Sequence, residues 1–219
     1  MIKTGIQSFD DAVGGIDLRK TYLISGNKES GKEDFSYRLV ASALRDKNAV
    51  IYVTTGKTVN DVIASFQSRQ LNISQYMGNS FKIIDAYSRS ISPQSTDNSY
   101  TKMLNGPLDL TGISVALSAM NAEMSKEGVP VLNVIDSISV LMLYNNPTTI
   151  YRFLQFVCGR SKMAGISSVF LIDDEMHSPE VNETIKSIMD SVIMLRLENG
   201  KRSFKVLGNS KEVLDWKDI

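Results

Sequence analysis

The sequence predicts an α/β fold in which helices flank a mostly parallel central sheet that ends in a C-terminal β-hairpin. Short apolar runs alternate with longer amphipathic segments, as expected of successive βαβ units. A glycine-rich loop joins the first apolar run to a helix-like segment, and an Asn-Gly pair at 199–200 separates the last two runs. At 219 residues and 42% hydrophobic side chains, the chain is expected to form one domain over 1–219.

Seven strands are expected where β-branched and apolar residues form short runs. They cover Thr21–Ser25, Ala49–Thr54, Phe81–Asp85, Val131–Asp136, Ser167–Ile172, Ser191–Leu197 and Ser203–Leu207. Amphipathic spacing predicts helices at Lys32–Arg45, Val59–Arg69, Ile113–Lys126, Thr149–Met163 and Glu180–Met189. In the third helix, the apolar residues share one face that we interpret as core: Ile113, Ala116, Leu117, Met120 and Met124.

The segment 88–106 interrupts this alternation. It is rich in Ser, Asn, Gln, Thr and Asp and shows almost no apolar periodicity. Such composition predicts a long, mobile surface loop and a place for partner contact.

Composition excludes several kinds of function. Lys plus Arg equals Asp plus Glu at 24 each, so no overall field attracts nucleic acid or an anionic membrane. No apolar run reaches the roughly 18 residues that span a bilayer, and we expect a cytoplasmic protein without membrane contact.

The single cysteine, Cys158, rules out an internal disulfide and lies among residues at helical spacing, which indicates a buried structural thiol. The single histidine, His177, lies in a polar turn and is interpreted as a solvated loop residue.

The glycine-rich loop after the first expected strand has the pattern of a phosphate-binding P-loop. Its residues are Gly26, Asn27, Lys28, Glu29, Ser30, Gly31, Lys32 and Glu33. Backbone amides and a helix N-terminus form an anion site in such a loop, and the lysine reaches the outer phosphates. These positions therefore predict a site for ATP or ADP with magnesium.

Two carboxylates depart from the P-loop pattern. Glu33 stands where a serine or threonine hydroxyl normally coordinates magnesium. Glu29 lies inside the loop, where a charge about 5 Å from a phosphate costs about 3 kcal/mol at an effective dielectric of 20. Two interpretations stay open: a weak nucleotide site in which Glu33 binds the metal directly, and a relic loop that holds no cofactor and only begins a helix.

The opening residues 4–16, TGIQSFDDAVGGI, resemble the N-terminal signature of the archaeal KaiC-like and RadA-like ATPases of the RecA superfamily. Similar motifs follow at 51–55, 84–86, 134–137 and 188–195, so the resemblance spans nearly the whole chain. It implies a RecA-like P-loop fold with nucleotide placed between subunits. By this resemblance, Asp136 is the Walker B aspartate that holds magnesium through water; the alternative is that it caps the following helix.

The same resemblance indicates which functional groups are missing. Active family members carry one or two catalytic glutamates after the second strand, where this chain has Gly56 and Lys57. They also carry a late Lys-x-Arg pair that reaches the neighbouring nucleotide, whereas this chain has Lys205 followed two residues later by Leu207. Asp173 falls where the family places a polar residue after a central strand, and its charge suits triphosphate poorly.

We assign no catalytic residue on this basis, because phosphoryl transfer depends on each charged part of the site. The sequence favours a non-catalytic paralogue with a regulatory or scaffolding role through a protein partner or a homo-oligomer. An ATPase with rewired magnesium ligands and a motor-accessory protein remain alternatives. A role in DNA recombination would use a basic cluster near the carboxyl end: Arg196, Lys201, Arg202, Lys205 and Lys211.

Overall fold

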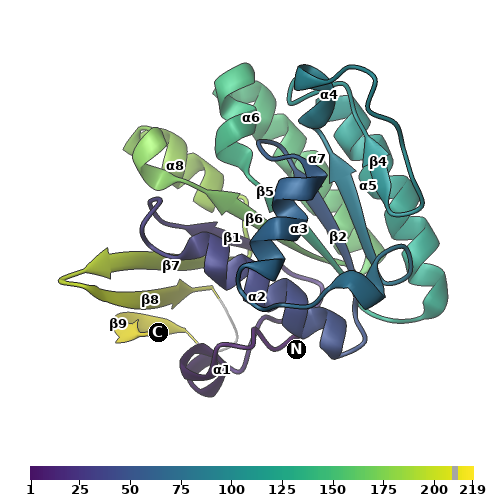
Figure 1. Cartoon of the computed structure of the whole chain (residues 1–219). Helices are drawn as coiled ribbons and strands as arrows, with labels where there is room; N and C mark the ends of the chain where they lie inside the picture. Colours follow the sequence, from purple (N-terminus) through teal and green to yellow (C-terminus); the bar gives the residue numbers. More distant parts are fainter. Residues whose placement is uncertain (209–211) are drawn as a thin grey trace.

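The computed structural model describes residues 1–208 and 212–219 and confirms the α/β class. Within these residues, one sheet has the strand order β4-β3-β2-β5-β6-β1-β7-β8-β9 (Figure 1). Strands β1 to β7 pair in parallel, and β8 and β9 add in antiparallel fashion. The bounds are β1 Thr21–Ser25, β2 Ala49–Thr54, β3 Phe81–Asp85, β4 Thr101–Met103, β5 Val131–Asp136, β6 Ser167–Ile172, β7 Ser191–Glu198, β8 Lys201–Leu207 and β9 Val213–Asp218.

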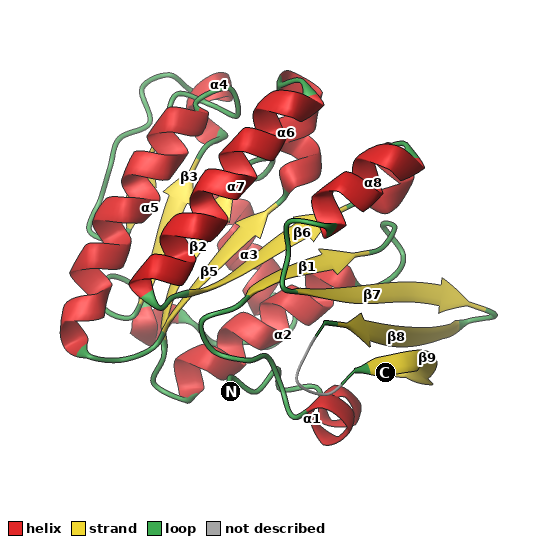
Figure 2. Cartoon of the chain, turned by 180° about the vertical axis from the view of Figure 1, so that it is seen from behind, coloured by secondary structure: helices red, strands yellow, loops and turns green. Residues whose placement is uncertain are grey.

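Helices cover both faces of this sheet. The first buried cluster unites one face with α1, α2 and α3, and the second unites the other face with α5, α6, α7 and α8 (Figure 2). Their bounds are α1 Gln7–Val13, α2 Lys32–Arg45, α3 Val59–Gln67, α5 Leu110–Met124, α6 Ile138–Tyr144, α7 Pro147–Ala164 and α8 Pro179–Lys186. The central strands are buried on both faces, which explains why they read as continuous apolar runs.

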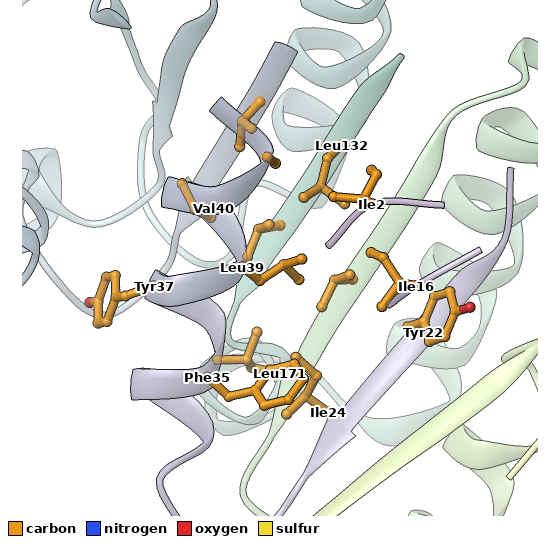
Figure 3. Packing of buried hydrophobic residues seen from close by; sticks show 14 of the residues in the cluster. Ile2, Ile16, Tyr22, Ile24, Phe35, Tyr37, Leu39, Val40, Leu132 and Leu171 are labelled. Atoms are coloured by element: carbon orange, nitrogen blue, oxygen red, sulfur yellow. The ribbon is translucent and has the colours of Figure 1, made fainter. Parts of the chain in front are cut away.

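The helix that follows the P-loop is anchored by apolar side chains. Phe35 and Leu39 of α2 belong to the same buried cluster as Ile24 of β1 and Leu171 of β6 (Figure 3). All four side chains are at most 1% exposed. Because burying such side chains is worth about 1.5–3 kcal/mol each, this packing fixes the first turn of α2 relative to the end of β1.

All seven predicted strands and all five predicted helices are present, with end shifts of a few residues. The predicted core face of α5 is confirmed, with Met120 partly buried at its margin. The hairpin between β7 and β8 is confirmed as well. Asn199 and Gly200 have φ angles of 52° and 75°, the left-handed pair that a tight two-residue turn requires. The sequence did not reveal α1, α6 or the edge strands β4 and β9.

The prediction for 88–106 needs correction, because the segment is not one long loop. It contains the short helix α4 (Ser88–Ile91) and the edge strand β4, which pairs in parallel with β3. Local caps hide this order from a periodicity argument: the Asn98 Oδ1 accepts the amides of Tyr100 and Thr101. The expected mobility and partner contact of the segment stay predictions.

Among the described residues, no helix is both long and apolar enough to cross a membrane.

Candidate nucleotide site at the carboxyl edge of the sheet

The P-loop joins the carboxyl end of β1 to the N-terminus of α2. Asp136 is the last residue of β5, Asp173 follows β6, and Lys57 lies in the turn after β2. Since these parallel strands all end at one edge of the sheet, the fold brings together residues that are up to 147 positions apart in the sequence. Ligands of open α/β sheets bind at such an edge, so this is the candidate site.

Two glycines let the P-loop adopt its close path. A side chain at Gly26 would place its Cβ 2.5 Å from the backbone oxygen of Leu195. Gly31 has a φ of 87° at the N-cap of α2, and a Cβ there would lie 3.1 Å from Arg202. The P-loop pattern therefore reflects a real backbone requirement in this chain, whatever the loop binds.

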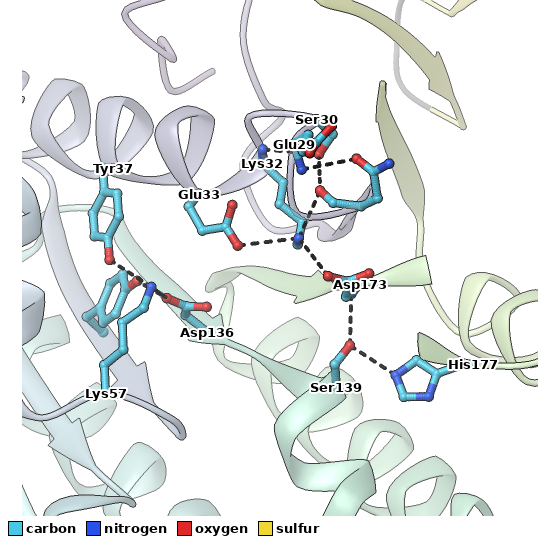
Figure 4. A network of polar contacts seen from close by, with 12 residues as sticks. Glu29, Ser30, Lys32, Glu33, Tyr37, Lys57, Asp136, Ser139, Asp173 and His177 are labelled. Atoms are coloured by element: carbon cyan, nitrogen blue, oxygen red, sulfur yellow. Dashed lines mark hydrogen bonds and ion pairs between the residues drawn. The ribbon is translucent and has the colours of Figure 1, made fainter. Parts of the chain in front are cut away.

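The Lys32 ammonium is already satisfied by protein groups. Its side chain is 4% exposed, and its Nζ donates to the Asn27 carbonyl at 3.1 Å and to Asp173 Oδ2 at 3.3 Å. Glu33 Oε1 also lies 3.3 Å from this nitrogen (Figure 4). Two carboxylates and a carbonyl thus surround the group that the P-loop pattern assigns to the outer phosphates.

The remaining loop residues have separate roles. The Ser30 hydroxyl donates to the Asn27 carbonyl at 2.6 Å and closes the loop on itself. Lys28 and Glu29 are exposed, so water screens the charge of Glu29 and weakens the repulsion that the sequence suggests.

Within the described part of the chain, two side-chain donors bind the Asp136 carboxylate, and neither is a helix amide. Its Oδ2 accepts the Tyr52 hydroxyl at 2.6 Å and lies 3.4 Å from Lys57 Nζ. Lys57 also donates to the Tyr37 hydroxyl at 3.3 Å (Figure 4). The N-cap residue of α6, Ser137, makes no side-chain cap, so the helix-capping alternative for this Asp-Ser pair finds no support.

The charges of this cluster follow from its geometry. Burial works against the charged form of Lys57, but Asp136 and Tyr37 outweigh it, and the pKa of Lys57 is raised. Burial and the Asp136 carboxylate raise the pKa of Tyr52 well above its ordinary range. At neutral pH the cluster therefore holds a protonated lysine and a neutral tyrosine beside Asp136.

His177 is not the solvated loop residue that the sequence suggests. It is half-buried, and its Nε2 lies 3.0 Å from the hydroxyl of Ser139, a residue that is 1% exposed. That hydroxyl also accepts the backbone amide of Asp173 at 2.8 Å. Burial lowers the pKa of His177, although Asp173 opposes the shift. The histidine therefore helps to position the segment after β6.

Asp174 and Glu175 also contact the P-loop and the strand before it, although neither belongs to a recognised sequence motif. Asp174 Oδ2 accepts the Ser25 hydroxyl at 2.9 Å, and Glu175 Oε1 accepts the Asn27 side-chain amide at 2.9 Å. No spacing rule identifies these residues, because they approach the loop from about 150 positions away. The only signal is the run of acidic residues after a buried strand.

Lys205 lies apart from the loop. It is opposite Met194 in β7, which in turn is opposite Ser25, so Lys205 is two strands or about 10 Å from the end of β1. Within the described residues, it makes no hydrogen bond or ion pair with the P-loop. The basic cluster is also divided: Arg196 stacks on Trp216 at 4.1 Å, and Lys211 lies outside the described residues.

The donor set does not fit magnesium. Glu33 is paired with Lys32, and the Asp136 Oδ2 is engaged by Tyr52 and Lys57. No group of three or more His, Cys, Asp or Glu side chains in the described part of the chain is arranged to hold a metal ion. Magnesium in ATPase sites keeps several waters and uses one or two carboxylates beside the phosphates, and here ammonium groups pair with both candidate carboxylates.

The opening motif is held together by the Asp10 side chain. The Asp10 carboxylate accepts the amide and hydroxyl of Thr4 at 2.9 and 3.0 Å and the amide of Gly5 at 3.0 Å. Phe9 of α1 packs against Phe35 in the first turn of α2, with ring centroids 5.0 Å apart. A cleft of about 720 Å³ opens there, between the outer side of the P-loop, α1 and the β7–β8 hairpin.

Comparison with known proteins agrees with this architecture. A family model described as the KaiC ATPase matches residues 2–208. A UPF0273 protein of Aeropyrum pernix is 26% identical over 144 residues, which cover 65% of this chain and 56% of that protein. The circadian clock oscillator protein KaiC of Acaryochloris marina is 26% identical over 210 residues, covering 92% of this chain and 38% of that protein. KaiC of Synechococcus elongatus is 23% identical over 207 residues, covering 92% of this chain and again 38% of that protein.

The chain thus spans between 38% and 56% of the length of these relatives. The family model covers nearly all of the described sheet and every residue of the candidate site. The chain therefore belongs to the KaiC family of ATPases and has the RecA-like fold of that family.

Proposed function

We propose that this chain is a non-catalytic member of the KaiC family that acts as a regulatory or scaffolding protein. One observation carries the proposal. Lys57 stands where the family resemblance places a catalytic glutamate, and its ammonium lies 3.4 Å from Asp136, the Walker B position.

The replacement changes the chemistry of the site. Hydrolysis of ATP needs a group that orients or deprotonates an attacking water. A lysine with a raised pKa is protonated at neutral pH and has no lone pair for that task. Lys57 therefore supplies a fixed positive charge in place of a base.

The same ion pair removes a metal ligand. The active members of an ATPase family bind a nucleotide together with magnesium. Here the Asp136 Oδ2 is shared between Tyr52 and Lys57, and Glu33 is paired with Lys32. An ATPase with rewired magnesium ligands would have to break both arrangements, so the geometry favours the non-catalytic alternative.

No observation singles out DNA or motor-accessory work. Arg196 of the basic cluster also pairs with Glu198 at 2.9 Å, so a phosphate would have to compete with a carboxylate there. We retain a protein partner or a second copy of the chain as the proposed partner.

A phosphate-release assay tests the proposal. The unmodified chain, Lys32→Ala and Lys57→Glu are assayed with saturating ATP and magnesium. We expect the unmodified chain to turn over ATP no faster than Lys32→Ala. Magnesium-dependent hydrolysis that is lost in Lys32→Ala would overturn the proposal. Lys57→Glu shows whether restoring the carboxylate suffices for activity.

A further inference from the structure

Three consecutive carboxylates after β6, Asp173 to Glu175, each contact a different group of the P-loop or of the strand end before it. We call these residues the acidic segment. Asp173 contacts the Lys32 ammonium, Asp174 the Ser25 hydroxyl and Glu175 the Asn27 side-chain amide. The three distances lie between 2.9 and 3.3 Å.

The backbone of the acidic segment is held in this position from behind. The Ser139 hydroxyl accepts the amide of Asp173 at 2.8 Å, and the Asn182 side-chain amide donates to the carbonyl of Asp174 at 2.8 Å. Ser139 belongs to α6 and Asn182 to α8, so two helices fix the segment. The carboxylates face the loop because their backbone is anchored on the opposite side.

These contacts occupy hydrogen-bond donors of the P-loop and of the end of β1 that a bound anion would otherwise use. A polyphosphate at Lys32 would compete with Asp173 for the ammonium. It would also face the half-buried charge of Asp174 and the exposed charge of Glu175, which water screens in part. Like charges brought together without a counterion lower affinity and are a common means of excluding a ligand. The acidic segment reads Asp-Asp-Glu and contains no cation of its own, and the cation that pairs with it, Lys32, is the one that a polyphosphate would also need.

We propose that Asp173, Asp174 and Glu175 are specificity-determining residues that occupy the P-loop as an internal anion and exclude free polyphosphate. This deepens the proposed function and rests on the P-loop being the site concerned. On this proposal, the acidic segment and the altered catalytic positions together lower the affinity of the P-loop for nucleotide. Removing the three charges should therefore reopen the loop to ATP.

Calorimetric titration with ATP and with inorganic tripolyphosphate, both in EDTA, tests this inference. The variant Asp173→Asn/Asp174→Asn/Glu175→Gln keeps the size of the side chains and one acceptor oxygen on each, and removes the three charges. We expect it to bind both probes at least about 10-fold more tightly than the unmodified chain. Adding Lys32→Ala to it should abolish the gain.

A matched control removes three carboxylates elsewhere. Asp46→Asn/Asp215→Asn/Glu127→Gln changes the net charge equally at exposed positions outside the P-loop and outside the helices that fix the acidic segment. An equal gain in this control, or no gain in the acidic-segment variant, would overturn the inference.

A milder variant keeps the inference testable if circular dichroism shows that the triple variant is unfolded. Glu175→Gln alone is then titrated, since Glu175 is exposed and its side chain accepts a hydrogen bond from the Asn27 side chain. We expect about threefold tighter binding, and no change would refute the inference. Hydrolysis by the unmodified chain would refute the proposed function, whereas unchanged binding would refute the role of the acidic segment and leave the absence of turnover intact.

Discussion

Replacing Lys57 with methionine is the perturbation that examines the Asp136 cluster most closely. Methionine keeps the apolar stem and removes the ammonium. Among the residues that the structure describes, the Asp136 side chain, which is 10% exposed, then retains only the Tyr52 hydroxyl as a donor at 2.6 Å. We expect the variant to be less stable because a nearly buried carboxylate loses its counterion.

The expected loss of stability follows from the distance between the two charges and from the exposed fractions of the two side chains. Two unit charges 3.4 Å apart attract by about 5 kcal/mol at an effective dielectric of 20. The Lys57 side chain is 37% exposed, so solvent screening and the cost of ordering it reduce the net value to about 1–2 kcal/mol. For a protein of this size, that loss corresponds to a melting temperature lower by about 5 °C.

Thermal unfolding followed by circular dichroism measures the effect, with Lys102→Met as the control. Lys102 also pairs with a carboxylate, Asp97 at 2.6 Å, but the two side chains are 49% and 41% exposed. We expect the control to lose less than about 0.5 kcal/mol. If Lys57→Met melts at or above the temperature of the unmodified chain, the reasoning about Asp136 is wrong.

The pH dependence supplies an independent check on this pair. The pKa of Lys57 is raised above its ordinary value of 10.5, so its contribution is fully present below pH 10.5 and is lost as the pH rises through the higher folded-state pKa. The stability difference between the unmodified chain and Lys57→Met should therefore be constant from about pH 7 to 9.5 and shrink only above 10.5. A difference that disappears between about pH 6 and 8 would assign the effect to another group.

Three further predictions concern the scaffold. Asp10→Ala leaves the amide and hydroxyl of Thr4 without their acceptor, and urea unfolding should show a loss of about 1–3 kcal/mol; an unchanged midpoint would contradict it. Gly15→Ala would place a Cβ 2.3 Å from the Ile2 carbonyl at a φ of 113°, and we expect a loss above about 2 kcal/mol in the same assay; a neutral effect would contradict the close approach. Burial raises the pKa of Cys158 to about 12, so Ellman's reagent at pH 8 should label the native thiol at least about 100-fold more slowly than the unfolded one; equal rates would contradict its burial.

Much of the sheet could be predicted because its strands are buried on both faces. Runs such as Val131–Asp136 are apolar at most positions, and a short apolar run between turn residues is typical of a strand that helices cover on both sides. The edge strand β4 escaped prediction because it has only three residues and follows polar turns. Strand β9 has exposed residues at Leu214 and Asp215 and follows no strict alternation.

The contiguous motifs of the site could be predicted from the sequence, but the contacts between side chains far apart in the sequence could not. The P-loop and Asp136 belong to contiguous motifs, so a sequence pattern identifies them. The pairing of Lys57 with Asp136 joins residues 79 positions apart, and the contact of Glu175 with Asn27 joins residues 148 apart. Only the parallel order of the strands brings these side chains to one edge of the sheet, and no spacing in the sequence encodes that distance.

The most direct measurement for the central claim is a crystal structure of the protein grown with ATP and magnesium. We predict that electron density calculated without ligand or side-chain bias will show the Lys57 ammonium still paired with Asp136, with no metal ion between Asp136 and the P-loop. A triphosphate seated against Lys32, with magnesium bound by Glu33 or Asp136 and Lys57 displaced, would contradict the account.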